Sequence, residues 1–361
     1  MRPFRIALSG DYLNEAGESA YGDLGWSSWD SQPCIRYRFL TEQAPRPDDR
    51  GYWDRFYSLE ITPEQIADID GLVVVRPWVQ RAAFRDGAAN LVVIGRSGAG
   101  YDKIDLDACT ENDVALFNAP LALNHSTASS ALLFILALAK RLPQQERITR
   151  QGRWDLQRAV LGGELPGRTL GIVGLGHSGR ELVRLVAPFE MRVLAYSPHA
   201  DATEASRLGV RLTTLEETLR EADFVSLHCR LTGATRRMIG SREFALMKRG
   251  VYFVNVARGE LVDEDALVKA LRSGHVAGAG LDVFEHEPLP RDHPLLELDN
   301  VIVTPHWSAS TTDVWRATSR AMIEGMMRAS QGLVPENVVN TAVLERPGFR
   351  AKLVRFAENR P

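Results

Sequence analysis

The sequence predicts an α/β protein built on doubly wound parallel sheets, and three observations lead to that prediction. Short, continuous apolar runs recur along the chain, as is typical of strands buried on both faces. Segments of helix length separate most of these runs, as crossovers between parallel strands require. The length of 361 residues suits two domains of ordinary size.

The N-terminal third contains four predicted strands, at residues 6–8, 72–75, 91–94 and 114–117. Residues 11–60 are rich in Gly, Pro, Trp and Tyr and have no assignable pattern. A long helix is predicted over residues 126–152, with Thr127 near its N-cap. Residues 131–139 are apolar all round, so we expect them to be buried. Pro143 should kink or break this helix.

The alternation of strand and helix becomes regular after residue 169. A strand at 170–173 precedes a helix at 179–189 and a strand at 191–196. Four further strands are predicted, at residues 224–227, 251–256, 277–281 and 301–303. A final long helix is predicted over 313–330.

Composition narrows the classes of function. The formal net charge of −3 gives no general attraction to nucleic acid or to an anionic membrane. The longest apolar run, 131–139, is too short to span a bilayer, and the N-terminus has no apolar signal core. The three cysteines form no CxxC pair, so we expect reduced thiols, no metal site and a cytoplasmic protein.

The sequence Gly-Leu-Gly-His-Ser-Gly follows the strand at 170–173 and opens the next helix. A dinucleotide needs this order of strand, glycines and helix. Gly174 permits the tight turn, Gly176 lets the backbone approach the pyrophosphate, and Gly179 lets the helix pack on the strand. The intervening His177 and Ser178 are candidate phosphate neighbours at the helix N-terminus.

The residue that would contact the cofactor ribose is harder to assign. An NAD site usually has an acid at the end of the second strand, and Ser197 stands there in this chain. No Arg replaces the acid to hold a 2′-phosphate. The sequence therefore favours NAD and leaves NADP or dual use open.

Three segments with candidate chemistry each follow a predicted buried strand: Asn-Val-Ala-Arg-Gly from 255, Asp-Val-Phe-Glu-His-Glu-Pro from 282 and Thr-Pro-His-Trp from 304. Ligands of open α/β sheets bind at such strand ends. At these blocks the chain resembles the D-isomer-specific 2-hydroxyacid dehydrogenase family, and the resemblance runs from about residue 72 to 340. The combined order and spacing of the blocks is specific to that family.

The resemblance implies a catalytic set of Arg258, Glu287 and His306. His306 would exchange a proton with the substrate oxygen, since imidazole titrates near neutral pH. Glu287 would orient the imidazole and favour its protonated form. Arg258 would bind the substrate carboxylate as a fork and polarise the carbonyl. The implied reaction is hydride transfer between NAD(P)H and a small anionic 2-oxo acid or D-2-hydroxy acid.

Three adjacent residues, Glu285, His286 and Glu287, could each serve as an acid or base, and the family pattern distinguishes them. The family's catalytic Glu directly precedes Pro, which selects Glu287; Glu285 is interpreted as a structural or surface residue and His286 as an exposed loop residue. His293 is expected on the surface. The resemblance also places a set of residues at the cofactor, alongside Arg258 and His306: Cys229, Val256, Ala257 and Asp282.

Substrate contacts are expected in a second glycine-rich loop. Backbone N–H groups of Gly98, Ala99 and Gly100 would bind the substrate carboxylate, although a plain strand-to-helix turn is the alternative. Arg76 matches a family position that faces the substrate; the alternative is a surface salt bridge. Residues 11–60 do not follow the family, so they could extend this region and alter specificity.

The implied organisation is two doubly wound Rossmann-like domains. The dinucleotide-binding domain, 119–307, is inserted into a flavodoxin-like substrate domain formed by 1–118 and 308–361, and a homodimer is expected. The alternative function is an NAD(H)-sensing scaffold, like the corepressors of this fold, which keep the same three residues. Formate dehydrogenase is disfavoured, because that branch has Gln in place of Glu287; phosphoglycerate dehydrogenase stays open.

Overall fold

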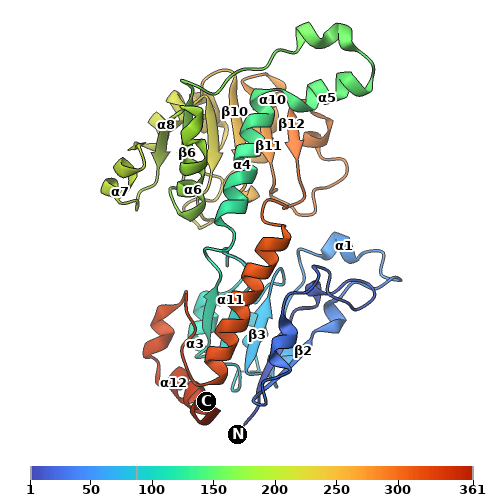
Figure 1. Ribbon diagram of the computed structural model, residues 1–361, viewed down its shortest axis with the longest axis vertical. Coiled ribbons are helices and arrows are strands. Elements are labelled where there is room, and N and C mark those ends of the chain that lie inside the picture. Colours follow the sequence, from blue (N-terminus) through green and yellow to red (C-terminus); the bar gives the residue numbers. More distant parts are fainter. Residues whose placement is uncertain (1, 87, 360–361) are drawn as a thin grey trace. The chain divides into compact units, whose positions relative to one another are not determined.

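The chain divides into two compact units, each with its own parallel sheet (Figure 1). The computed structural model describes residues 2–86 and 88–359. Unit 1 comprises Met1–Leu123 with Thr311–Pro361, and unit 2 comprises Asn124–Ser310. The predicted fold class, with two Rossmann-like α/β domains, is confirmed. Among the described residues, no helix has both the length and the apolar character that crossing a membrane demands.

Unit 1 has five parallel strands in the order β2-β1-β3-β4-β5, which is the flavodoxin-like order. The strands are β1 (Phe4–Leu8), β2 (Ile35–Phe39), β3 (Gly71–Val74), β4 (Val93–Arg96) and β5 (Ala115–Asn118). Sequence analysis missed the edge strand β2, which lies within residues 11–60. Its sequence, Ile-Arg-Tyr-Arg-Phe, alternates apolar and basic residues as a half-exposed strand does.

Both faces of this sheet are covered. Phe4, Val73 and Phe117 share one core with Met322 and Met326 of α11 (Thr312–Ser330). The alternate strand residues form a second core with the short helices on the other side. The remaining helices of unit 1 are α1 (Tyr52–Arg55), α2 (Pro63–Ile66), α3 (Leu106–Glu111) and α12 (Pro347–Val354).

Unit 2 has seven parallel strands in the order β12-β11-β10-β9-β6-β7-β8. Their bounds are β6 (Thr169–Val173), β7 (Arg192–Tyr196), β8 (Val210–Leu212), β9 (Phe224–Leu227), β10 (Val251–Asn255), β11 (Val276–Leu281) and β12 (Val301–Val303). Helices on both faces complete it: α4 (Asn124–Ala139), α5 (Leu142–Arg150), α6 (His177–Val186), α7 (Ala202–Arg207), α8 (Leu215–Glu221), α9 (Ser241–Leu246) and α10 (Glu264–Arg272). The edge strand β8, Val-Arg-Leu, was not predicted, because a central Arg interrupts its apolar pattern.

The long helix predicted over residues 126–152 is two helices. It breaks at Arg141, whose φ of 51° is left-handed, and Pro143 lies in the first turn of α5, where a missing N–H costs nothing. The placement of Thr127 near the N-cap is wrong, because α4 begins at Asn124. Burial of every residue in 131–139 is also wrong, since Leu133 is 48% exposed.

Candidate functional site

The predicted residues of unit 2 follow the carboxyl ends of six strands. Because all strands are parallel, these ends lie along one edge of the sheet. Gly174 follows β6, Ser197 follows β7 and Cys229 follows β9 by two positions. Val256, Ala257 and Arg258 follow β10, Asp282 follows β11, and His306 comes three residues after β12. Strand order therefore brings separate sequence blocks to one edge.

The three fingerprint glycines have different reasons to be glycine. A Cβ on Gly174, which has a φ of 101°, would lie 2.5 Å from the Cys229 nitrogen, and one on Gly179 would lie 2.4 Å from the Gly174 oxygen. These two positions are required by packing. A Cβ on Gly176 would meet nothing within 4 Å, and its backbone is extended. Gly176 therefore leaves open space at the N-terminus of the ten-residue helix α6, which fits a pyrophosphate.

His228 ties this helix to the sheet. Its Nδ1 lies 3.1 Å from the Ser178 hydroxyl and its Nε2 lies 2.9 Å from the hydroxyl of the buried Ser226. Burial lowers the pKa of His228 to about 4, so the ring is neutral near pH 7 and donates at one nitrogen while accepting at the other. This role of His228 was not predicted; Ser226, two residues earlier, was the available signal in the sequence.

The remaining cofactor candidates differ in accessibility. His177 is exposed beside Gly176, Ser197 is half-buried after β7, and Val256 is buried. Burial raises the pKa of the Cys229 thiol to about 11, so it is protonated and a weak nucleophile near neutral pH. Cys229 therefore contributes its backbone position, next to Gly174, rather than thiolate chemistry.

His306 and Glu287 are in direct contact. The His306 Nδ1 lies 2.8 Å from Glu287 Oε2, while Glu287 Oε1 accepts a 3.2 Å hydrogen bond from the Phe284 N–H. Burial opposes ionisation of Glu287, but the hydrogen bond and charge of His306, with smaller help from the Phe284 N–H and Arg258, hold its pKa below the ordinary value. Glu287 is therefore a carboxylate beside the imidazole at neutral pH.

Asp282 holds the turn that carries His306. Its fully buried carboxylate accepts three hydrogen bonds, from the Thr304 hydroxyl at 2.6 Å and from the N–H groups of Trp307 at 2.7 Å and Ser308 at 2.9 Å. His306 itself has a left-handed φ of 51° and donates its N–H to the Asp282 carbonyl. A non-glycine residue in this region needs such support. These contacts position His306; the predicted contact of Asp282 with the cofactor stays a prediction.

Arg258 lies in a loop organised by Asn255. The Asn255 side chain donates to the Arg258 carbonyl at 2.8 Å and accepts from the Ala257 N–H at 3.1 Å. The half-buried Arg258 side chain donates from Nη1 to the Ala257 carbonyl at 2.6 Å. Because its charge acts on Glu287, Arg258 belongs to the same electrostatic environment as the His306 pair.

The neighbours of Glu287 have other partners. Glu285 forms a two-nitrogen ion pair with Arg237, with its closest contact at 2.7 Å, and its N–H donates to the Glu264 carboxylate at 2.7 Å. His286 is exposed. The expectation of a surface His293 is wrong: its side chain is 20% exposed and its Nε2 lies 3.4 Å from Glu264 Oε2. Nothing in the sequence around His293 indicates that it pairs with Glu264.

The glycine-rich loop of unit 1 follows β4. Its Ser97 N–H donates to the Val74 carbonyl at 2.9 Å, which joins the loop to the end of β3. The Gly98 N–H donates to the Arg96 carbonyl at 2.8 Å, so this predicted donor already has a partner. Among the described residues, the N–H groups of Ala99 and Gly100 have no hydrogen-bond acceptor. These two are the better candidates for binding a carboxylate.

Arg76 follows β3 in the same unit, and its surroundings come from distant segments. Its Nη1 lies 3.4 Å from the fully buried carboxylate of Asp11 and donates to the Tyr21 hydroxyl at 2.9 Å. Its guanidinium lies 4.5 Å from the ring centroid of Phe56, and the Tyr21 ring stacks on Trp315 at 3.7 Å. Arg76 does form a salt bridge, and it is a largely buried one at a strand end.

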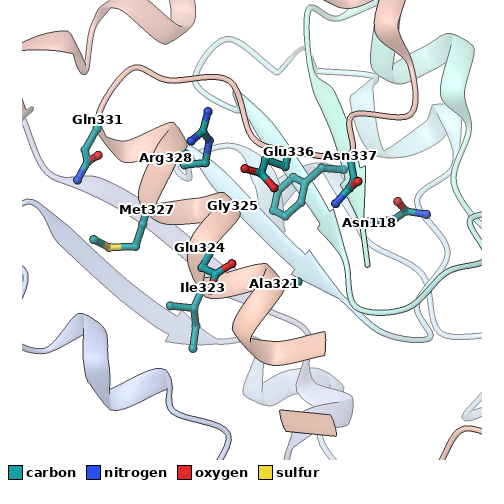
Figure 2. A pocket seen from close by; sticks show the side chains of 11 residues that line it. Asn118, Ala321, Ile323, Glu324, Gly325, Met327, Arg328, Gln331, Glu336 and Asn337 are labelled. Atoms are coloured by element: carbon teal, nitrogen blue, oxygen red, sulfur yellow. The ribbon is translucent and has the colours of Figure 1, made fainter. Parts of the chain in front are cut away.

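A cavity of about 470 Å³ opens beside α11 in unit 1 (Figure 2). Phe117 and Asn118 at the end of β5 line it together with Glu324, Arg328 and neighbouring residues of α11. None of the predicted substrate contacts lines this cavity. The candidate substrate residues of unit 1 therefore gather elsewhere, at the ends of β3 and β4.

The fold and the fingerprint define a two-unit α/β protein of the dinucleotide-binding class. A family described as "D-isomer specific 2-hydroxyacid dehydrogenase, NAD binding domain" matches residues 132–308. A glyoxylate reductase of Korarchaeum cryptofilum is 37% identical over 298 residues, which cover 81% of this chain and 90% of that protein. The chain belongs to the D-isomer-specific 2-hydroxyacid dehydrogenase family, as the sequence motifs predicted.

Other relatives differ in length. A D-3-phosphoglycerate dehydrogenase of Methanocaldococcus jannaschii is 42% identical over 278 residues, covering 77% of this chain. The chain spans only about half of that relative, 53% of its length. Among solved structures, the TT0316 protein of Thermus thermophilus is similar with a TM-score of 0.76 and 30% identity, covering 93% of this chain and 100% of that one.

Proposed function

We propose that this chain is a dehydrogenase that interconverts a small 2-oxo acid and its D-2-hydroxy acid, with NAD as cofactor. The observation that carries the proposal is the 2.8 Å contact between His306 Nδ1 and Glu287 Oε2 at a dinucleotide-binding sheet edge. The names of the related glyoxylate reductase and phosphoglycerate dehydrogenase support the substrate class.

Each residue has a defined task in this proposal. Bound nicotinamide supplies or accepts the hydride. Because Glu287 holds Nδ1, His306 carries the exchanged proton at Nε2, giving it to the alkoxide in reduction and removing it in oxidation. Glu287 favours the protonated ring and fixes its orientation. Arg258 binds the substrate carboxylate and polarises the oxo group. Arg76 and the Ala99 and Gly100 amides bind the rest of the substrate.

The cofactor residues are assigned on the same basis. The pyrophosphate lies over Gly176 at the α6 N-terminus, with Gly174, His177, Ser178 and Gly179 around it. Ser197 meets the ribose, and Cys229, Val256, Ala257 and Asp282 line the path to the nicotinamide. Ser197 neither repels a 2′-phosphate nor clamps it, so NADP use stays possible.

A spectrophotometric panel tests this function. Oxidation of NADH and NADPH is followed with glyoxylate, hydroxypyruvate, 3-phosphohydroxypyruvate and pyruvate, and the reverse reaction with D- and L-hydroxy acids. We expect turnover with at least one oxo acid and with D- but not L-hydroxy acids. Tight cofactor binding without turnover of any acid would instead favour the NAD(H)-sensing scaffold.

We also propose a cytoplasmic homodimer formed through unit 2. Large apolar side chains are exposed along the segment from α4 to residue 161: Leu133, Leu142, Trp154 and Leu161. In Figure 1 the part of this segment around α5 extends away from the sheet of unit 2. Exposed apolar residues on one segment are typical of an interface. Sedimentation analysis of the parent and Trp154→Asp tests it, with the dimer weakened in the variant.

A further inference from the structure

The loop that carries Glu287 is attached to the segment that carries Arg258. Two contacts join the loop and the segment, and the first is at Gly259, the residue after Arg258. A Cβ built on Gly259 would lie 1.9 Å from the Phe284 carbonyl carbon and 2.3 Å from the Glu285 nitrogen. No real side chain fits there, so the two backbones touch at this point.

The second contact is the carboxylate of Glu264, in the first turn of α10. Its Oε1 accepts the Glu285 N–H at 2.7 Å, and its Oε2 lies 3.4 Å from His293 Nε2. Glu285 and His293 stand on either side of Glu287 in the sequence. One carboxylate therefore holds both ends of the loop segment that presents Glu287 to His306.

Glu264 is well placed to act as an anchor. Its side chain is 12% exposed, and the next turns of α10 bury Leu267, Val268 and Leu271 in the unit 2 core. His293 Nδ1 accepts the Leu295 N–H at 3.3 Å, and its Nε2 lies on the side of Glu264, 3.4 Å from the carboxylate.

Burial and the neighbouring charges shift the pKa of Glu264 in opposite directions. Burial raises the pKa of Glu264; the Glu285 N–H and the two histidines His293 and His286 oppose this, and the charge of Glu285 adds to it. The net direction is a raised pKa. A buried carboxylate kept in such surroundings is more costly than a neutral side chain unless its hydrogen bonds serve the fold or the site.

We propose that Glu264 is a positioning residue that holds Glu287 against His306 through the Glu285 amide and His293. The inference rests on the proposed function for its effect on turnover, but its structural effect does not. Loss of Glu264 removes the acceptor of the Glu285 N–H and the carboxylate beside His293, so the loop is held less firmly. Glu287 then spends less time within hydrogen-bond distance of His306, and the imidazole is less often protonated at a given pH.

The test follows the His306 ring directly. NMR titration of ¹³C-labelled histidine, with the His306 signal assigned from its loss in His306→Gln, is run on the parent and on Glu264→Ala, Glu264→Gln and Arg237→Ala. In Glu264→Ala the titration midpoint of His306 should fall by ~0.5 pH unit or more, in the direction expected for a weakened carboxylate partner. Where turnover is found, kcat should fall about tenfold with KM nearly unchanged.

The other variants separate the contributions. Glu264→Gln keeps an oxygen for the Glu285 amide but loses the carboxylate oxygen beside His293. Its His306 titration midpoint should therefore lie between those of Glu264→Ala and the parent. Arg237→Ala is the matched control, because it removes the ion pair with the partly buried Glu285 side chain and a 4.0 Å contact with Asp263 but leaves both Glu264 contacts in place; its midpoint should equal the parent's.

Two outcomes would overturn the proposal. A folded Glu264→Ala protein, with parental thermal unfolding and NADH affinity, that keeps the parental His306 midpoint contradicts it. So does an equal shift in Arg237→Ala, which would assign the effect to general loosening of the loop. Absence of turnover in the parent would contradict the proposed function instead, while the NMR titration still decides the role of Glu264.

Discussion

The two units assemble their candidate site residues in different ways. In unit 2 the key contacts join residues close in sequence: Glu287 and His306 are 19 positions apart, and Asp282 and Trp307 are 25 apart. In unit 1 the hydrogen-bond and ion-pair partners of Arg76 are remote, with Tyr21 at 55 positions and Asp11 at 65. The contrast shows that strand-end motifs encode the candidate residues of unit 2, whereas long-range packing creates the surroundings of Arg76 in unit 1.

This difference leads to different expected defects. The unit 2 residues are proposed to act on the reacting oxygen and proton, so their loss should lower kcat. Arg76 and its surroundings are proposed to bind the part of the substrate that does not react, so changes there should raise KM. Four sets of variants test or refine this contrast.

The largest effect is expected for Arg258→Ala. Removing the fork that is proposed to polarise the oxo group and bind the carboxylate should lower kcat/KM roughly a thousandfold or more. NADH affinity, measured by fluorescence titration, should stay within about threefold of the parent because the fingerprint helix is untouched. Arg242→Ala, at an exposed position on α9, is the control and should be fully active. Near-parental turnover in Arg258→Ala would remove Arg258 from the mechanism.

The next effect concerns pH. The pKa of Glu287 is lowered, so its charge is present above that pKa and is lost only as the pH falls through it. Through the neutral range this charge supports protonated His306. In Glu287→Gln, kcat/KM for reduction should therefore decline at lower pH than in the parent, by about one pH unit. His306→Gln should lose most activity at every pH.

These two variants are measured together against the parent from acid to alkaline pH. An unchanged profile in Glu287→Gln would point to a different partner for His306. A fully active His306→Gln protein would exclude His306 as the proton donor.

A smaller effect is expected in unit 1 for Arg76→Lys. Lysine keeps the charge beside Asp11 but lacks the planar fork that fits Tyr21 and Phe56. KM for the oxo acid should rise about tenfold while kcat changes by less than about threefold. Arg36→Lys, on the exposed side of β2, is the control. A loss confined to kcat would contradict the assignment of substrate binding to unit 1 residues and of proton transfer to unit 2 residues.

The smallest effect is expected at the cofactor ribose. Ser197→Asp places a negative charge where a 2′-phosphate would bind, so kcat/KM with NADPH should fall about tenfold while the value with NADH stays within about twofold. The ratio of the two values is the measurement. A native preference for NADPH above about a hundredfold, equivalent to roughly 2.7 kcal/mol, would reveal a phosphate clamp that Ser197 does not explain.

Several features were predictable because they depend on local pattern. The strand residues 224–227 and 301–303 match β9 and β12, and the helix break near Pro143 follows from proline geometry. The exposure of Leu133 was not predictable, since an apolar helix surface looks the same in sequence whether a core or an open face receives it. His293 was misplaced because its partner, Glu264, lies in another element.

By itself, the sequence determined the succession of strands and helices, the glycine turn after β6 and the block of residues that follows each strand of unit 2. Hydrophobic periodicity and turn chemistry act over a few residues, so they can be seen in the chain without its fold. Only the tertiary structure decided which strand ends meet, which acid accepts the Glu285 N–H and lies beside His293, and what surrounds Arg76. Those contacts depend on strand order and on segments that pack together from far along the chain, and no local pattern specifies that order.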